Sequence, residues 1–480
     1  MSESVAQKTA RTSLWSSVER FANLGVNFIV QLILARMLVP SDFGVVAMMT
    51  VFIGICQAIS ESGITNALIR KQDCNQRDFS TAFYVSFALS IILYFILFHV
   101  APLIAQFYKM PLITALLRVY ALVFFFEALR IVQYARLCKR LEFKIIAKIS
   151  SISVFVSGII GLLTAYAGMG AWALIGQLLS ASIIYFIMIT IHERWIPDRC
   201  FDKQAFRYLW GFGSKMLLTG IISRIYGNIY SLVIGRYYNP TILGYFNNGQ
   251  RYGQFYPYLV ESVFARNSLP IFAEYQSNRV QLSNIYRKYI RLVSLLTFPA
   301  CLLLVLLARP LVVILLTEKW LGVVPYLQLF AVAALLVPAN TINLNILQAM
   351  GRTDLTLIAE IVKKSIGFVF VFFLVQFGPM WLAVGSGIMA LFAYCVNAYC
   401  AKIVLKLSII TQIKDVLDIF LSSMATAIFV YFLNISSSFL CIIVNSLIYF
   451  IIYFALIKYV VKEELVNQIS VMLKKLNYRR

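Results

Sequence analysis

The chain has 480 residues, of which 61% are hydrophobic and 15% aromatic, while only 13% carry a charge. Its mean hydropathy of +0.82 is far above the range of soluble domains. This composition excludes an enzyme built around a water-exposed catalytic module and leaves no room for a sizeable soluble domain. It predicts an all-α integral membrane protein. The formal charge of +22 therefore reflects membrane topology, and no nucleic-acid partner is expected.

Apolar stretches long enough to cross a bilayer as a helix recur along nearly the whole chain, separated by Pro, Gly and charge clusters. We expect fourteen transmembrane helices, at residues 14–37, 43–68, 79–107, 112–137, 147–167, 170–192, 206–235, 241–274, 289–316, 323–350, 355–377, 379–405, 415–433 and 438–461. The spans at 112–137 and 241–274 are the least apolar, because both carry several charges. The first span is too long for a cleavable signal peptide, so we expect it to be retained.

Basic residues alternate between the connections of these spans. If the N-terminus is cytoplasmic, the inner segments are 1–13, 69–78, 136–148, 193–207, 275–291, 351–364, 402–414 and 458–480, and they hold thirty Lys and Arg. The outer connections hold five, namely Arg36, Lys109, Arg236, Arg309 and Lys319. Because basic loops are retained in the cytoplasm, this pattern predicts a multi-pass protein of the inner (cytoplasmic) membrane with both termini cytoplasmic.

The chain repeats itself at an offset of 200 residues, which indicates two lobes. The recurring residues are Arg36, Pro40 and Gly44 in the first copy, and Arg236, Pro240 and Gly244 in the second. One copy alone is typical of a helix end, a Pro-set helix start and a close-packing Gly. Because each half has an even number of spans, the lobes should be related by an axis along the membrane normal and enclose a central cleft.

These patterns predict six regions along the chain. They are a cytoplasmic N-terminus at 1–13, an N-lobe of helices 1 to 6 at 14–192, a cytoplasmic linker at 193–205, a C-lobe of helices 7 to 12 at 206–405, two additional helices at 406–461, and a basic cytoplasmic tail at 462–480. The last two helices lie outside the repeat.

Polar residues form stripes on the first two spans of each half. Because successive helical residues are 100° apart, residues spaced by three or four lie on one face. The candidate substrate-binding residues on these stripes are Arg20, Asn23, Asn27 and Gln31 on span 1, Lys215 on span 7, and Asn247, Arg251 and Gln254 on span 8. One alternative is that these side chains form interhelical hydrogen bonds that hold the bundle together. Four stripes that include three cations favour a hydrated cationic cavity for an anionic head group, since Arg binds phosphate oxygens bidentately.

Two carboxylates also recur at the same offset, Glu61 and Glu261. They either neutralise the cations of the cavity, or take up a proton or Na⁺ and couple transport to a gradient. The sequence indicates no other cofactor. A metal site is not expected, because the two histidines, His99 and His192, are far apart and the eight cysteines form no CxxC pair.

The opening TSLWSSVERFANLGVNFIVQLILARMLVPSDFGVVAMMTVFIGICQAISESGITNALIRK, together with the duplicated six-span half, resembles the multidrug/oligosaccharidyl-lipid/polysaccharide exporter superfamily. Within it, the chain is most similar to Wzx-type flippases of polysaccharide repeat units, in particular the colanic-acid exporter branch. The most specific elements are ARMLVPSDFG, ESGITNALIRK and the following DFSTAFY. The resemblance covers nearly the full length and is densest at residues 14–110.

The resemblance implies a flippase that moves undecaprenyl-diphosphate-linked oligosaccharide from the cytoplasmic to the periplasmic leaflet by alternating access. Such transport serves lipopolysaccharide, capsule or exopolysaccharide biosynthesis. It implies the lipid-linked oligosaccharide and the bilayer as partners, with the polysaccharide polymerase and chain-length machinery as further ones. It also implies that Arg20 and Arg251 lie where a lipid portal needs phosphate ligands.

Two other functional classes fit the sequence less well. A polymerase or lipid-linked glycosyltransferase normally has a large outer loop with catalytic residues, whereas every outer connection expected here is short, so we do not expect an enzyme. A multidrug or cation exporter of the same superfamily is the alternative function. That exporter would need an acidic cavity, whereas the stripes offer three cations against two repeated carboxylates.

Overall fold

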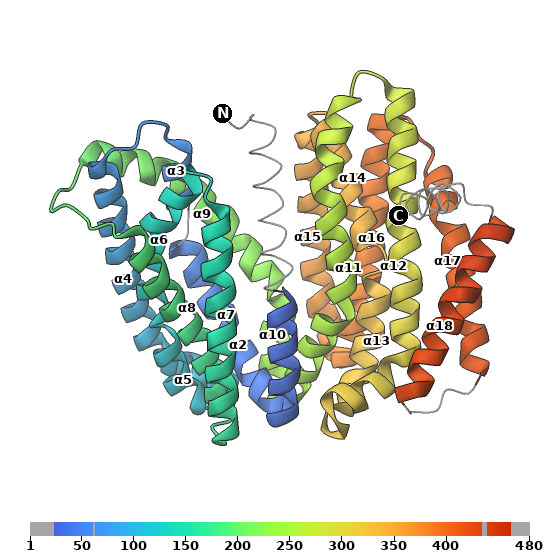
Figure 1. Ribbon diagram of the computed structural model, residues 1–480, viewed down its shortest axis with the longest axis horizontal. Coiled ribbons are helices and arrows are strands. Elements are labelled where there is room, and N and C mark those ends of the chain that lie inside the picture. The colour runs from blue at the N-terminus through green and yellow to red at the C-terminus, as the bar shows by residue number, and fades with distance from the viewer. Residues whose placement is uncertain (1–23, 61–62, 434–438, 462–480) are drawn as a thin grey trace, which may run out of the picture. The chain divides into compact units, whose positions relative to one another are not determined.

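The computed structural model describes residues 24–60, 63–433 and 439–461, and all regular secondary structure within these ranges is helical (Figure 1). The chain divides into two compact units, Met1–Gly244 and Tyr245–Arg480. Three predicted site residues, Arg20, Asn23 and Glu61, lie outside the described residues.

Unit 1 contains the helix Leu24–Met37 and nine labelled helices. These are α2 (Pro40–Ser60), α3 (Ile64–Arg70), α4 (Gln76–Tyr108), α5 (Leu112–Tyr120), α6 (Val123–Lys139), α7 (Phe143–Tyr166), α8 (Ala171–Glu193), α9 (Lys203–Gly227) and α10 (Ile229–Tyr237). Side chains set several of the helix starts. Asn75 and Asp78 form a capping box at the start of α4, and the Asp202 carboxylate accepts from the first backbone N–H groups of α9.

Small residues bring the helices of unit 1 close together. A Cβ built on Gly161 of α7 would lie 2.9 Å from the Cβ of Gln177 on α8. One built on Gly158 would lie 2.7 Å from a methyl group of Val30. Glycine at these positions therefore permits the tight interhelical approach that is typical of membrane bundles.

Unit 2 is a second helical bundle, and α11 begins with the last residues of unit 1. Its elements are α11 (Pro240–Glu274), α12 (Arg279–Leu316), η1 (Glu318–Val323), α13 (Val324–Ala333), α14 (Val337–Ala349), α15 (Thr353–Leu374), η2 (Val375–Phe377), α16 (Pro379–Leu405), α17 (Ile409–Phe432), α18 (Phe439–Leu456) and η3 (Ile457–Val461).

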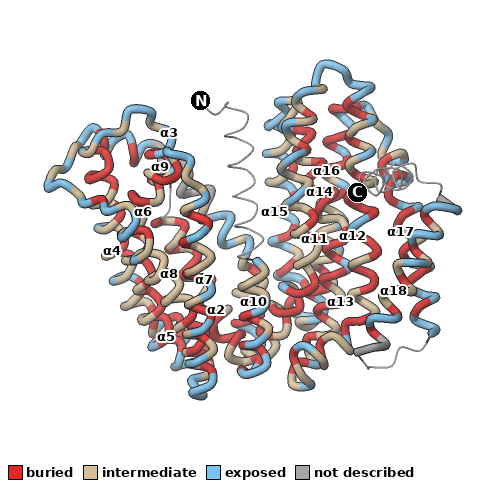
Figure 2. Tube along the Cα trace, viewed as in Figure 1, coloured by how far each residue is buried: buried red, intermediate tan, exposed pale blue. Residues whose placement is uncertain are grey.

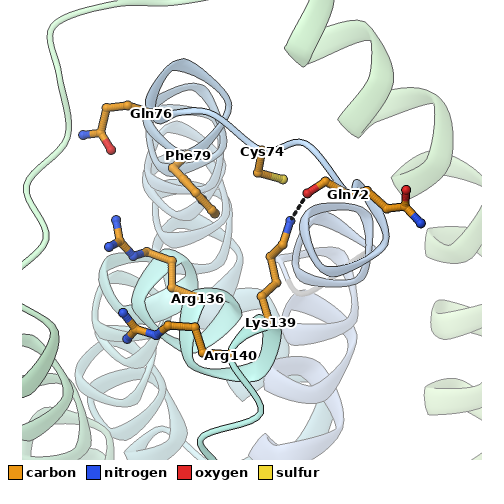
Figure 3. Close-up of a pocket in the computed structure, with 7 residues that line it drawn as sticks. All are labelled: Gln72, Cys74, Gln76, Phe79, Arg136, Lys139 and Arg140. Atoms are coloured by element: carbon orange, nitrogen blue, oxygen red, sulfur yellow. Dashed lines mark hydrogen bonds between the residues drawn. The ribbon is translucent and has the colours of Figure 1, made fainter. Parts of the chain in front are cut away.

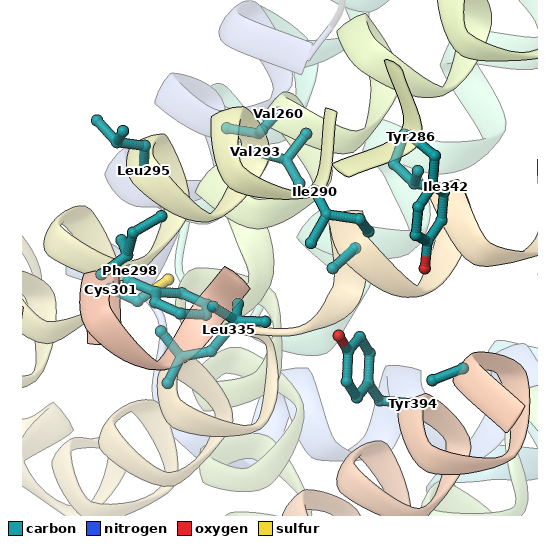
Figure 4. Close-up of a cluster of buried hydrophobic side chains, with 14 of the residues drawn as sticks. Val260, Tyr286, Ile290, Val293, Leu295, Phe298, Cys301, Leu335, Ile342 and Tyr394 are labelled. Atoms are coloured by element: carbon teal, nitrogen blue, oxygen red, sulfur yellow. The ribbon is translucent and has the colours of Figure 1, made fainter. Parts of the chain in front are cut away.

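The core of unit 2 forms around α12. Ile290 and Val293 are each 1% exposed and pack with Ile342 of α14 and Val260 of α11 (Figure 4). This single cluster continues to α17 and α18, where Tyr453 is fully buried. The two helices that follow the sequence repeat are thus packed onto the same core as the rest of unit 2.

Buried and exposed residues alternate along the helices (Figure 2), and many large apolar side chains lie on the exterior as well as in the core. On α15, the apolar side chains Leu357 and Val369 are 63% and 69% exposed. Asn343 and Asn397, by contrast, are fully buried. Apolar side chains facing outwards and polar ones facing inwards are what a lipid solvent favours, so the chain is an all-α multi-pass membrane protein.

Every predicted span coincides with helical segments, and Leu24–Met37 represents the described part of span 14–37. Within the described residues, ten helices are long and apolar enough to cross a membrane. The four predicted spans without such a helix are 14–37, 206–235, 241–274 and 355–377. Two of them, α9 and α11, carry polar stripes that lower their hydropathy. Fourteen crossings therefore remain a prediction.

The observed helices and units differ from the predicted spans and lobes in two ways. The spans 112–137, 206–235 and 323–350 are each two helices, interrupted near Ala121, Asn228 and Ala334. Before α14 the break precedes Pro338, which has no N–H to continue a helix. The units divide after Gly244 because α9 and α10 pack against α2, α3 and α4. The lobe boundary at 193–205 rests on the sequence repeat and stays a prediction.

Candidate functional site

The predicted site residues fall on three helices of the described structure. Lys215 lies on α9, although its side chain is not among those described. Asn27 and Gln31 lie on the helix Leu24–Met37, and Asn247 and Arg251 lie on α11 with Gln254 and Glu261. The most complete set is therefore on α11.

We define the α11 stripe as Asn247, Arg251, Gln254, Tyr258 and Glu261. At 100° per residue these five side chains lie within about 80° of one another around the helix. Arg251 is exposed and Tyr258 is 51% exposed, and the other three are half-buried. The stripe is thus a continuous hydrophilic face.

The opposite face of α11 packs against α13. A Cβ on Gly249 would lie 2.9 Å from the backbone nitrogen of Leu327, and one on Gly253 would lie 2.8 Å from the carbonyl oxygen of Leu327. Phe246 is fully buried and makes an edge-to-face contact with Phe330, with ring centroids 4.9 Å apart. Because this face holds α11 to the unit 2 core, the α11 stripe points away from that core.

Polar residues of α14 fix the second half of α11. The Thr341 hydroxyl donates to the Glu261 carboxylate at 2.6 Å. The Asn345 amide donates to the Ser268 hydroxyl at 2.7 Å and to the Ala265 carbonyl at 2.8 Å. Sequence reasoning missed these α14 residues, although the run NTINLN in the middle of an apolar span was the signal.

In unit 1, two polar side chains within the predicted spans bond to neighbouring helices. Gln31 is 8% exposed, and its amide donates to Gln177 of α8 at 3.1 Å. Gln57 of α2 donates to Glu127 of α6 at 3.0 Å. These contacts are the interhelical hydrogen bonds that the sequence left open as an alternative. Asn27, one turn before Gln31, is half-buried.

The cations within the membrane-spanning helices have different surroundings. Arg118 donates to the Phe98 carbonyl at 3.2 Å and lies over the Phe98 ring at 4.0 Å. Arg130 lies 4.6 Å from the Tyr185 ring centroid. Both guanidinium groups are therefore engaged with aromatic rings, in the structural roles expected of charges that face protein. Arg251, on a hydrophilic face, is the stronger candidate for an anionic ligand.

A pocket of about 320 Å³ lies on unit 1 near the predicted cytoplasmic ends of its helices (Figure 3). Its lining residues are Gln72, Cys74, Gln76, Phe79, Arg136, Lys139 and Arg140. The Lys139 ammonium donates to backbone carbonyls of Leu68, Lys71 and Gln72, at the end of α3. The guanidinium groups of Arg136 and Arg140 both bond to the buried Glu193. The protein itself engages these cations, so the pocket is a structural junction of α3, α4, α6 and α8.

The neighbouring loop is held in the same way. Lys71 and Asp78 form an ion pair at 2.6 Å. Burial alone would lower the pKa of Lys71, but the hydrogen bond and the charge of Asp78 raise it above its ordinary value. The connection between α3 and α4 is thereby fixed by an ion pair.

Buried polar side chains, a lipid-type exterior and a hydrophilic stripe on an all-helical chain define a multi-pass membrane transporter. Residues 33–325 match the family of polysaccharide biosynthesis proteins, and the chain belongs to this family.

The comparisons with individual proteins agree with this assignment. The chain is 23% identical to the lipopolysaccharide biosynthesis protein WzxC of Escherichia coli (strain K12), over 84% of this chain and 82% of that protein. It is 26% identical to the succinoglycan biosynthesis transport protein ExoT of Rhizobium meliloti (strain 1021), over 71% and 69%. Its fold is similar to that of the lipid II flippase MurJ in an inward closed conformation, with a TM-score of 0.74, 14% identity, and coverage of 94% and 98%. The chain is a membrane transporter of polysaccharide biosynthesis and not an enzyme.

Proposed function

We propose that this protein is a flippase for undecaprenyl-diphosphate-linked oligosaccharide repeat units. It moves them from the cytoplasmic to the outer leaflet by alternating access, and they are then used for surface lipopolysaccharide, capsule or exopolysaccharide. Membership of the polysaccharide biosynthesis family supports the substrate class. The observation that carries the proposal is the α11 stripe, in which Arg251 is exposed on a hydrophilic face of a membrane helix.

The diphosphate is the part of the substrate that Arg251 recognises, because a guanidinium binds phosphate oxygens bidentately. Arg20 and Lys215 are the other two cations of the proposed substrate-binding set. Asn23, Asn27, Asn247 and Gln254 bond to the sugar hydroxyls. Gln31 supports the helix that carries Asn27, since its amide is already bonded to Gln177.

Glu61 and Glu261 are the candidates for coupling to a proton or Na⁺ gradient. Their other role is to balance the cations of the cavity. The hydrogen bond from Thr341 holds the Glu261 carboxylate in one orientation on the α11 stripe, which suits either role.

The same proposal places the protein in the inner membrane of a bacterium with both termini in the cytoplasm. There the assembled substrate is available on one side, and the polymerase with its chain-length machinery takes up the product on the other.

The test is the fate of lipid-linked repeat units in a strain that lacks the gene. We expect these lipids to accumulate on the cytoplasmic face while the surface polymer disappears, and the intact gene to restore export. Arg251→Ala should lower polymer export about tenfold or more, since a hydrogen bond to a charged group contributes about 1.5–3 kcal/mol.

The matched control is Arg352→Ala, which removes the same charge from an exposed arginine whose partner is Asp354. It should leave export unchanged. Normal export by Arg251→Ala at equal abundance removes Arg251 from the site. Absence of accumulated lipid with the polymer intact rejects the flippase, and a drug-efflux assay then tests the multidrug exporter alternative.

A further inference from the structure

The two copies of the repeated Arg-x3-Pro-x3-Gly motif meet each other in the structure. α2 begins at Pro40 and α11 begins at Pro240, and Gly44 and Gly244 are the fifth residues of these helices. All four residues belong to unit 1. The sequence repeat by itself gives no reason for the copies to touch.

Their contact is reciprocal. A Cβ built on Gly44 would lie 1.8 Å from the carbonyl oxygen of Pro240, and a Cβ on Gly244 would lie 1.9 Å from the carbonyl oxygen of Pro40. Ordinary contact with a Cβ begins at 3.4 Å. The two backbones therefore cross in direct contact, and any side chain larger than that of glycine requires them to separate.

The crossing has the form of a two-fold interface, because each copy presents the same glycine to the same proline carbonyl of the other. Within its own helix, each of these carbonyls accepts the N–H of the glycine four residues later. The opposing glycine packs directly against it. The two helices can therefore part at this crossing with the hydrogen bonds inside each helix intact.

Neighbouring residues hold the second copy in place. A Cβ on Gly235 of α10 would lie 2.8 Å from the Tyr108 ring and 3.1 Å from the Met48 side chain of α2. The Asn239 side chain caps the start of α11 by accepting from the Ile242 N–H at 2.8 Å. The end of α10 thus packs against α2 and α4 directly before α11 begins.

We propose that this crossing is a glycine-dependent gate on the outer side of the transport path, closed in this structure, that must part for the substrate to leave. The inference rests on the proposed function and on the predicted topology, in which the connections at Arg36 and Arg236 are outside. It also explains the duplicated motif, since each half of the chain supplies one half of the gate.

The test combines Gly44→Ala and Gly244→Ala in one chain. Thr50→Cys is the reporter, because it lies about 9 Å further into the membrane along α2 at 1.5 Å per residue. A membrane-impermeant thiol reagent is added to intact cells, and labelling is read against the same chain without Thr50→Cys. We expect the paired alanines to raise the labelling rate about fivefold or more, since overpacking a contact shifts an equilibrium by that order.

The control is Gly211→Ala with Gly227→Ala, because nothing lies within 4 Å of a Cβ at either position of α9. This pair should label as slowly as the unaltered chain. If the chain with both alanines does not accumulate in the membrane, the single variant Gly244→Ala is tested instead. We expect it to raise the labelling rate by a smaller factor. Equal labelling of the gate variant and the control at equal abundance overturns the gate.

The gate and the proposed function fail separately. Faster labelling of the gate variant, with no lipid-linked oligosaccharide accumulating in the deletion strain, supports the gate and rejects the flippase. Accumulation in the deletion strain, with labelling unaffected by the alanines, supports the flippase and rejects the gate.

Discussion

In each unit, one buried carboxylate lies close to two arginines. Glu193 bonds to Arg136 and Arg140, and its side chain is 2% exposed. In unit 2, the Asp415 side chain is 3% exposed. Its carboxylate accepts from Arg287 through two hydrogen bonds of 2.7 Å, and Arg291 lies at 3.5 Å.

In each case the two arginines are four residues apart and so lie on one face of their helix. A carboxylate with two such partners joins α6 to α8 in unit 1 and α12 to α17 in unit 2. Because these carboxylates already neutralise the neighbouring arginines, these arginines do not indicate a ligand-binding site.

Glu261 is the carboxylate whose role can be decided by substitution. If it takes up the coupling ion, Glu261→Gln should lower export and remove its dependence on pH or Na⁺, because the amide binds neither a proton nor Na⁺ in the same way. Thr341→Val is the matched variant, since it removes the hydrogen bond and keeps the charge. It should lower export and retain the ion dependence. The measurement is surface polymer at several pH values and Na⁺ concentrations.

An active Glu261→Gln protein with unaltered dependence would leave Glu261 the role of balancing the cations. Charge pattern alone does not separate these roles in the sequence. The sequence repeat identified Glu261, and the polar stripe of span 8 identified Arg251. Neither pattern identified Thr341 as the partner of Glu261, because the choice of partner depends on how α11 and α14 pack.

At the scale of helices, the positions of the elements follow from apolar length, and their interruptions do not. The span 323–350 holds no charged residue, yet it is the two helices α13 and α14. Pro338 gave a local signal for that break. Asn228 gave none as strong, and in the structure its side-chain amide and backbone N–H both donate to the Arg224 carbonyl at the end of α9. Gln31 shows the same limit, because its position on the polar face was predicted and its bond to α8 was not.

Close packing of α11 on α13 is a testable property of the elements. Gly253→Ala would put a methyl group 2.8 Å from the Leu327 carbonyl oxygen and 2.9 Å from the Ala331 nitrogen, so α11 must shift. We expect a loss of about 1–3 kcal/mol in stability, the usual cost of overpacking. The measurement is the Tm of the purified protein in detergent.

Gly387→Ala on α16 is the control for that substitution. Its new methyl group would meet only the Cβ of Ala333, at 3.7 Å, which is ordinary van der Waals contact. Its Tm should equal or slightly exceed that of the unaltered chain. A Gly253→Ala protein as stable as this control would show that α11 and α13 are not in the contact described.

For the whole molecule, the strongest sequence argument is the alternation of basic segments, because it uses all connections at once. This argument is weakest for the helices whose hydropathy is below that expected of a span, above all α11 and α15. On α11 the cause is the polar stripe, and on α15 it is the charges near the middle of the helix, where Glu360 bonds to Lys363 and Lys364. Both helices have polar groups that a protein interior or interface can receive, so we expect both to cross.

Single introduced cysteines at the two ends of each helix test these crossings. The fourteen-span topology predicts that Tyr237→Cys, before α11, and Phe377→Cys, after α15, are labelled by an impermeant thiol reagent in intact cells. Gln276→Cys, after α11, and Asp354→Cys, at the start of α15, should be labelled only after the membrane is permeabilised. All four positions are exposed, so burial does not protect them. Labelling of both ends of α11 or of α15 from the same side would mean that this helix does not cross the membrane. The distribution of thirty inner and five outer basic residues would then require a different set of spans.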